Sequence, residues 1–163
     1  MSQMSWAAYS DAQRDRAPRP LCTEVLELAG PGAARVARDL GCGAGVETRA
    51  LLAAGWRVHA IDSEPGTVER VLEATRDLNQ DLLTITCADI AELPDLSAAD
   101  LVYAGYSLPF VTPENFATMW HSLRTNLEPG GWLAVNLLGD QHSCANNQRT
   151  QKLAPSLISS PAK

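Results

Sequence analysis

The sequence lacks the cysteine and histidine patterns that hold disulfide frameworks and zinc ions. None of its cysteines forms a C-x-x-C pair, and no histidine lies at zinc-ligand spacing. The four cysteines are far apart, at Cys22, Cys42, Cys87 and Cys144. We therefore expect no metal site, and free thiols of this kind favour a reducing, cytoplasmic environment.

Long apolar runs and basic stretches are also missing. The N-terminal segment has no apolar centre like that of a signal peptide, and no run of about 18 apolar residues could span a bilayer. The net charge is −6 and the basic residues are scattered singly, so there is no positive stripe for a nucleic acid. We expect a soluble protein that binds neither membranes nor nucleic acid.

The 163 residues, 45% of them hydrophobic, suit one globular domain in which strand and helix patterns alternate. The predicted strands are 35–40, 56–62, 82–87, 101–104 and 132–138. The predicted helices are 21–29, 46–54, 64–78 with Ser63 as its cap, and one that begins at Pro113; a turn is expected at 129–131. This alternation predicts an α/β fold, a doubly wound and mostly parallel sheet with helices on both faces.

A glycine-rich loop follows the first predicted strand. The sequence DLGCGAG occupies residues 39–45, directly before a helix, where a βα unit places an anion or a nucleotide. Glycine at these positions permits positive φ and close approach of the backbone to a ligand. The spacing is G-x-G-x-G, and Val46 stands where a dinucleotide fingerprint requires its third glycine. A nicotinamide dehydrogenase is therefore disfavoured.

Asp39, the spacer Leu40 and the glycines of residues 41–45 together resemble the first motif of class I S-adenosylmethionine-dependent methyltransferases. Asp62 agrees with this family, because it ends the second predicted strand about 20 residues after the loop. The resemblance implies a Rossmann-like sheet with strand order 3-2-1-4-5 and S-adenosyl-L-methionine as the cofactor.

The resemblance also implies which residues bind the cofactor. Asp39 is expected at the methionyl amino group, Asp62 at the two ribose hydroxyls and Asp89 at the adenine amino group. The other expected cofactor-binding residues are Gly41, Cys42, Gly43, Ala44, Gly45, Ser63 and Ile90. From the residues alone, Asp62 as a helix cap and Asp89 as a solvent-facing acid remain alternatives. Arg38 precedes Asp39 in a strand expected to be buried, and should pair with an acid or reach solvent.

The acceptor pocket is expected beyond the carboxyl ends of the fourth and fifth strands, where open α/β sheets bind ligands. Its candidate residues are Tyr103, Tyr106, Ser107, Pro109, Phe110, Asn136 and Asp140. Tyr106 and His142 are the candidate catalytic residues, with packing and simple solvation as the alternatives. In-line methyl transfer from a sulfonium depends mainly on positioning, so a general base is optional.

The two ends of the chain differ from its centre. Residues 1–20, with Trp6 and Tyr9, resemble the opening of small-molecule methyltransferases of the tellurite-resistance type; they either cover the cofactor or form a plain amphipathic leader. The resemblance ends near residue 142. Residues 143–163 have no sustained period and contain the only two lysines. We expect an irregular tail there, truncated or out of frame, in place of strands six and seven.

These expectations define a cofactor-binding domain over residues 1–142 and a separate tail over 143–163. Without a hairpin beside it, the fifth strand would be an open apolar edge and would favour a homodimer. The predicted function is methyl transfer from S-adenosylmethionine to a small-molecule acceptor. The alternative is a catalytically inactive protein that binds S-adenosylmethionine or a nucleoside.

Overall fold

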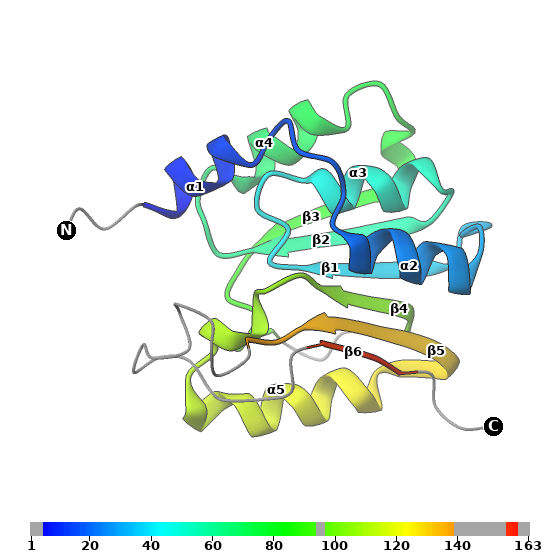
Figure 1. The fold of residues 1–163 in the computed structure, drawn as a ribbon, viewed down its shortest axis with the longest axis vertical. Coiled ribbons are helices and arrows are strands. Elements are labelled where there is room, and N and C mark those ends of the chain that lie inside the picture. Colours follow the sequence, from blue (N-terminus) through cyan, green and yellow to red (C-terminus); the bar gives the residue numbers. More distant parts are fainter. Residues whose placement is uncertain (1–4, 94–96, 139–155, 160–163) are drawn as a thin grey trace.

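The computed structural model describes residues 5–93, 97–138 and 156–159, and its centre is a six-stranded sheet in the order β3-β2-β1-β4-β5-β6 (Figure 1). Five strands run parallel and the sixth runs antiparallel to β5. Their bounds are β1 (Val36–Leu40), β2 (Arg57–Asp62), β3 (Leu83–Cys87), β4 (Ala99–Ala104), β5 (Leu127–Asn136) and β6 (Ser156–Ser159). The predicted parallel sheet with strand order 3-2-1-4-5 is confirmed.

Helices cover both faces of the sheet (Figure 1). One face carries α2 (Pro20–Ala29), α3 (Val46–Ala53) and α4 (Thr67–Ala74), and the opposite face carries α5 (Pro113–Thr125). A short additional helix, α1 (Trp6–Ala12), lies by the carboxyl ends of the strands, at the left of Figure 1. This arrangement is the predicted doubly wound architecture.

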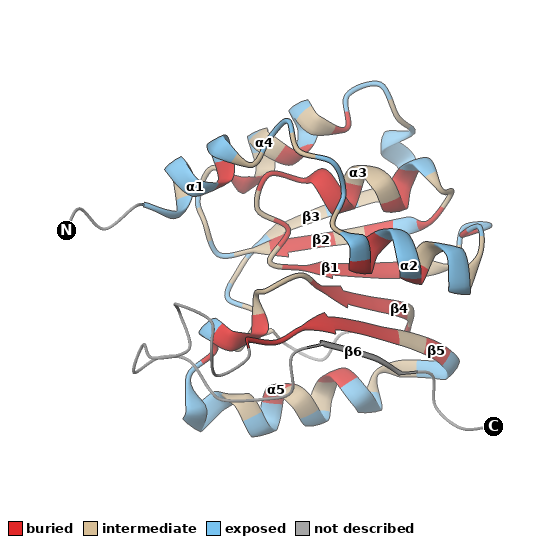
Figure 2. Cartoon of the chain, in the orientation of Figure 1, coloured by how far each residue is buried: buried red, intermediate tan, exposed pale blue. Residues whose placement is uncertain are grey.

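The central strands are buried on both sides, as the red strands in Figure 2 show. On the α2 and α3 face, Val25 and Leu51 pack with Trp56 and with residues of β1 and β4. On the α5 face, Met119 and Leu123 pack with alternate residues of the same strands. Because apolar packing occupies both faces, polar side chains that face a ligand gather at the strand ends.

The helix α4 is shorter than the predicted helix 64–78. It begins at Thr67 with Gly66 as its N-cap, so Ser63 is not the cap that the sequence suggested. At the other end, the Thr75 hydroxyl donates to the Val71 carbonyl at 2.7 Å and α4 ends at Ala74. The turn at 65–66 delays the helix, because proline and glycine favour a turn there.

The strand β5 starts earlier than predicted and includes the expected turn at 129–131. Leu127 pairs with Ala99 and Trp132 pairs with Leu101, so five steps along β5 match two along β4. This irregularity accommodates the positive φ of Gly130, +81°. The strand therefore bends at these residues instead of beginning after them.

The tail prediction is wrong at Ser156–Ser159, which form β6. This strand pairs with Leu133–Asn136 of β5, so the edge that was expected to be open is occupied over those residues. The hydrogen-bonding groups of β5 therefore already have a partner over those residues, and the homodimer stays a prediction. The other residues of 143–163 lie outside the described residues.

Arg38 behaves differently from both sequence-based expectations. It is 2% exposed, and its Nη2 donates to Ser97 Oγ at 3.3 Å. No ion pair joins it to a carboxylate in the described ranges. Burial lowers the pKa of its guanidinium. Within the part of the chain that the structure describes, Arg38 therefore neither pairs with an acid nor reaches solvent.

Candidate functional site

A pocket of about 780 Å³ opens at the carboxyl ends of the parallel strands, between α1, the glycine-rich loop and the segment after β4. Most of the residues predicted to hold a ligand line it. They are Asp39, Gly41, Cys42, Gly43, Ala44, Asp62, Ser63, Asp89, Ile90 and the catalytic candidate Tyr106. His142 and Asp140 lie outside the described residues.

The three glycines of the loop have different structural roles. All three have positive φ: +74° at Gly41, +50° at Gly43 and +78° at Gly45. A Cβ at Gly41 would lie 2.3 Å from Ser107 Cβ, whereas a Cβ at Gly43 would meet only Ser10 Oγ at 3.5 Å. Gly43 therefore leaves room for a ligand above the loop, and Gly41 permits close packing of the loop against the segment after β4.

Gly45 stands apart from the other predicted residues, because it is not part of the pocket lining. It is the N-cap of α3, and a Cβ there would lie 3.2 Å from Val71 Cα and 3.3 Å from Ala74 Cβ. Its position serves the contact between the loop and α4.

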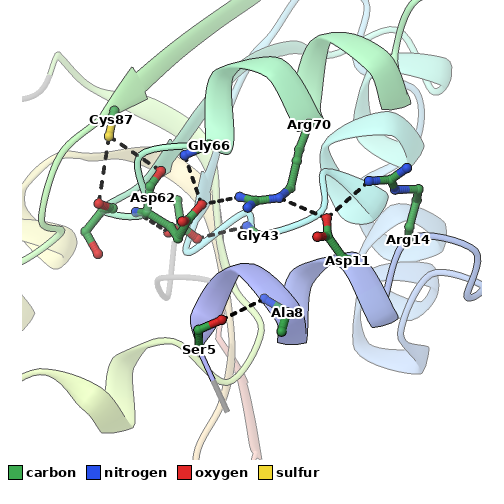
Figure 3. A network of polar contacts seen from close by, with 11 residues as sticks. Ser5, Ala8, Asp11, Arg14, Gly43, Asp62, Gly66, Arg70 and Cys87 are labelled. Atoms are coloured by element: carbon green, nitrogen blue, oxygen red, sulfur yellow. Dashed lines mark hydrogen bonds and ion pairs between the residues drawn. The ribbon is translucent and has the colours of Figure 1, made fainter. Parts of the chain in front are cut away.

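The Asp62 carboxylate is oriented at the end of β2. Its Oδ2 accepts from the Gly43 backbone N–H at 2.9 Å, and its Oδ1 accepts from the Glu64 N–H at 2.9 Å (Figure 3). Each oxygen has a second lone pair left to accept a further hydrogen bond. Asp62 thus links the glycine-rich loop to β2 and still faces the pocket, and Gly66, not Asp62, occupies the cap position of α4.

Asp39 is a buried carboxylate that forms no ion pair with the described residues. It is 1% exposed, and its Oδ2 accepts a hydrogen bond from Thr48 Oγ at 2.6 Å. Burial, together with the negative charge of Glu47, raises the pKa of Asp39 to about 7. A cation bound beside Asp39 would favour its ionised form.

Glu47 is also buried, at 5% exposed, but it is fully paired. Both of its oxygens accept from the Arg16 guanidinium, at 2.6 and 2.7 Å, and Oε1 also accepts from the Arg19 backbone N–H at 3.0 Å. The ion pair raises the pKa of Arg16. This bidentate pair attaches the segment before α2 to the first turn of α3.

The remaining predicted ligand contacts lie around the rim of the pocket. Ser63 and Asp89 are exposed and Ile90 is half-buried. Asp89 Oδ1 accepts from the Ala91 N–H at 2.8 Å, which is a local turn contact. Cys42 is buried, and burial raises the pKa of its thiol well above the ordinary value. The thiol is therefore protonated near neutral pH and is no nucleophile.

The wall after β4 is built from aromatic side chains. Tyr106 has φ +61°, a left-handed conformation that is unusual for a tyrosine, and the Arg19 guanidinium lies 5.1 Å from the centre of its ring. Such strain is often found at functional sites. Tyr103, Ser107 and Phe110 also line the pocket, while the predicted Pro109 and Asn136 do not.

The helix α1 covers one side of the pocket. Trp6 packs edge-on against Phe110 with a centroid distance of 4.9 Å, and Trp6 and Tyr9 both line the cavity. Figure 3 shows the polar connection at the other end of α1, where Asp11 pairs with Arg70. Arg70 also pairs with Glu64. One end of α1 therefore contacts the pocket wall at Phe110, and the other end is held by Arg70 of α4.

Sequence reasoning missed the roles of Arg16, Arg19, Glu47 and Thr48. Arg16 and Glu47 are 31 residues apart, and only their pairing in the fold reveals the connection. In the sequence, Glu47 is an ordinary acid in the first turn of a helix. The sequence signal for this part of the site was the opening segment with Trp6 and Tyr9, and it did not single out either arginine.

The described residues include no group of three or more metal-ligating side chains. None of their helices is long and apolar enough to cross a membrane. The pocket lining supplies carboxylates, guanidinium groups, phenols and backbone N–H groups.

A family model described as a methyltransferase domain matches residues 37–131, more than half of the chain. Among curated proteins, the chain is similar to the carboxy-S-adenosyl-L-methionine synthases of Erwinia tasmaniensis, with 32% identity, and Vibrio parahaemolyticus, with 29%. Each match extends over 103 residues, 60% of this chain. The matched segment spans only 42% of the length of either relative.

Solved structures with the same fold include the N-methyltransferase NodS from Bradyrhizobium japonicum, with a TM-score of 0.68 and 21% identity over 81% of this chain and 74% of that one. TehB from Haemophilus influenzae has a TM-score of 0.72 and 17% identity, over 90% of this chain and 51% of that one. NodS has also been solved in complex with S-adenosyl-L-homocysteine, and that structure has a TM-score of 0.66 and 19% identity over 83% of this chain and 74% of that one.

Proposed function

The chain belongs to the methyltransferase domain family, and from this premise we propose that it transfers the methyl group of S-adenosyl-L-methionine to a small-molecule acceptor. The observation that carries the proposal is the oriented Asp62 carboxylate beside the open Gly43 backbone. A carboxylate at this position is the acceptor that a ribose diol requires, and the loop leaves space for the rest of a nucleoside.

The residues of the pocket fit the charges of this cofactor. The buried Asp39 forms no ion pair with the described residues, so a bound ammonium or sulfonium group would compensate its charge. Asp62 would hold the ribose, and Ser63, Asp89 and Ile90 lie where the adenine would extend along the rim. Gly41, Cys42, Gly43 and Ala44 would form the floor.

When bound, S-adenosylmethionine supplies an electrophilic methyl group on a good leaving group. The chain then has to hold the acceptor in line with that group and to exclude water. Trp6 and Tyr9 of α1, with Phe110 opposite, would close the pocket over the reacting atoms. Tyr106 lies on the acceptor side and would position the nucleophile. We place this binding unit in residues 1–142, with residues 1–20 as its cover.

Titration calorimetry tests the cofactor site. The wild type should bind S-adenosylmethionine with micromolar affinity, and Asp62→Asn should weaken binding at least tenfold, because the amide offers one acceptor oxygen instead of two. Asp81→Asn is the matched control: this exposed residue lies outside the pocket and should bind normally. A folded wild type that does not bind S-adenosylmethionine would contradict the proposal.

Turnover requires a separate experiment. The purified protein is incubated with S-adenosylmethionine and mixtures of small thiols, amines and phenols, and S-adenosylhomocysteine formation is measured by mass spectrometry. Product that depends on both the acceptor and Asp62 supports methyl transfer. Tight binding without product from any mixture would favour the alternative of a protein that binds the cofactor and does not catalyse.

A further inference from the structure

The aromatic residues of the chain are concentrated at the pocket. The sequence has four tryptophans, three tyrosines and two phenylalanines. All three tyrosines line the pocket, with one tryptophan and one phenylalanine: Tyr9, Tyr103, Tyr106, Trp6 and Phe110. Three of these side chains are exposed, Trp6 by 55% and Tyr9 and Phe110 by 38% each. Large apolar groups gathered in the open in this way mark a surface that binds a ligand.

Trp6 and Phe110 form a corner between two nearly perpendicular rings. Their centroids are 4.9 Å apart and their planes meet at 81°. Tyr9 continues the row, 6.0 Å from Trp6 and at 88° to it. Aromatic rings favour edge-to-face and offset-stacked contacts, and these contacts add to the effect of burial alone. A third, flat ring placed in this corner can form both kinds of contact, one with each side chain.

The fold holds Phe110 in place before a ligand binds. Phe110 ends a short 3-10 helix, Leu108–Phe110, whose first two residues are buried. Leu108 belongs to the core on the α5 face, and the Phe110 N–H donates to the Ser107 carbonyl at 3.1 Å. A ring that is already positioned loses little conformational entropy when it contacts a ligand. Phe110 is therefore suited to select a ligand by its shape.

The charges on the aromatic side of the pocket disfavour a cation. Aromatic rings by themselves also suit a quaternary ammonium group. Here, however, the Arg19 guanidinium lies 5.1 Å from the ring centre of Tyr106 and donates to Tyr9 Oη at 3.3 Å. The acids of the lining lie at or after β1, β2 and β3, apart from Glu47, which is paired with Arg16. None of these acids comes from α1 or from the described segment after β4.

We propose that the acceptor is a small, planar aromatic molecule without a positive charge, whose ring occupies the corner between Trp6 and Phe110. This inference rests on the function proposed above and adds the class of acceptor to it. A hydroxyl or amino group on the ring is the nucleophile, and the ring contacts hold it at attack distance. Its oxygen or nitrogen forms a bond to the methyl carbon, the carbon–sulfur bond breaks with its electron pair on sulfur, and the proton of the nucleophile passes to water.

Calorimetry with a matched pair of ligands tests the proposal, on protein saturated with S-adenosylhomocysteine. 2-Naphthol has flat rings, and decahydro-2-naphthol has the same carbon skeleton with saturated, puckered rings. The wild type should bind 2-naphthol about fivefold or more tightly than its saturated analogue. Phe110→Leu should reduce this preference to within about twofold, because leucine keeps an apolar side chain without the ring. Equal affinity of the wild type for the two ligands would overturn the proposal.

Phe116→Leu is the matched control. Phe116 is the other phenylalanine of the sequence, and it lies on α5 outside the pocket lining. This variant should keep the preference of the wild type for 2-naphthol. Trp6→Leu removes the second ring of the corner and should reduce the preference as Phe110→Leu does. A full preference retained in either Phe110→Leu or Trp6→Leu would overturn the placement of the acceptor ring.

Tetramethylammonium tests the competing occupant, a cation held by the same rings. It should bind about tenfold or more weakly than 2-naphthol, and tighter binding than that of 2-naphthol would overturn the proposal. A titration with S-adenosylhomocysteine comes first, since a folded wild type that does not bind it would refute the proposed function itself. Binding of S-adenosylhomocysteine without a preference for the flat ligand would refute only the class of acceptor.

Discussion

The two walls of the pocket differ in how the fold builds them. The wall at the ends of β1 and β2 consists of the glycine-rich loop and Asp62, whose carboxylate accepts hydrogen bonds from backbone N–H groups within one short stretch of chain. The opposite wall combines Arg16, Arg19 and the Tyr106 segment from distant parts of the sequence. The first wall is thus fixed by local backbone geometry, and the second by pairing between remote side chains.

Substitutions of the two buried acids, Asp39 in the first wall and Glu47 in the second, are expected to change the free energy of unfolding the most. The pKa of Asp39 is about 7 in the folded state against an ordinary 3.8, so the folded state holds a proton that the unfolded chain releases above pH 4. Stability is therefore lost as pH rises from about 4 to about 7. Asp39→Asn should raise the free energy of unfolding at pH 8 by on the order of 4 kcal/mol, at about 1.4 kcal/mol per pKa unit.

Glu47→Gln is the matched variant and should change stability in the opposite direction. It leaves the Arg16 guanidinium without its bidentate partner, which should lower the free energy of unfolding by about 2 kcal/mol. Urea unfolding at pH 5 and pH 8 measures both variants. The increase in the free energy of unfolding caused by Asp39→Asn should be smaller at pH 5 than at pH 8. If both variants changed the free energy of unfolding in the same direction, the contrast between the walls would be contradicted.

The next largest change in stability is expected at Gly41, where the two walls are in contact. Gly41→Ala adds a Cβ 2.3 Å from Ser107 Cβ at a positive φ, whereas Gly30→Ala adds one at nearly the same φ with nothing within 4 Å. We expect a loss of about 2 kcal/mol of unfolding free energy for Gly30→Ala, because its ψ of −171° also disfavours alanine, and about 3 kcal/mol for Gly41→Ala, where overpacking adds to the backbone strain. Similar losses in chemical unfolding would show that the two walls do not constrain each other.

The smallest effect concerns α1. Arg70→Gln removes the ion pairs to Asp11 and Glu64, and should increase hydrogen exchange in α1 several-fold with a stability change below about 1 kcal/mol. Arg76→Gln breaks the exposed pair with Glu73 and serves as the control. Equal exchange rates in α1 for the two variants would show that Arg70 does not hold this helix.

The sequence was sufficient to predict the five parallel strands and the residues of the first wall. Alternating apolar segments and the glycine spacing are local patterns, and they survive in the fold as predicted. The second wall could not be predicted, because Arg16 and Glu47 meet only after α2, β1 and α3 have packed. The four residues of β6 were missed for a similar reason: so short a strand has little pattern of its own, and its pairing depends on β5.

The packing of Ser107 against Gly41 limits how the two walls can diverge in evolution. Ser107 Oγ donates to the Leu40 carbonyl at 2.6 Å, and its Cβ occupies the space that a side chain at position 41 would need. A larger residue at 107 would displace the loop, and a larger residue at 41 would displace Ser107. New acceptor preferences are therefore expected to arise at neighbours such as Tyr106 or Phe110, while positions 41 and 107 stay small together.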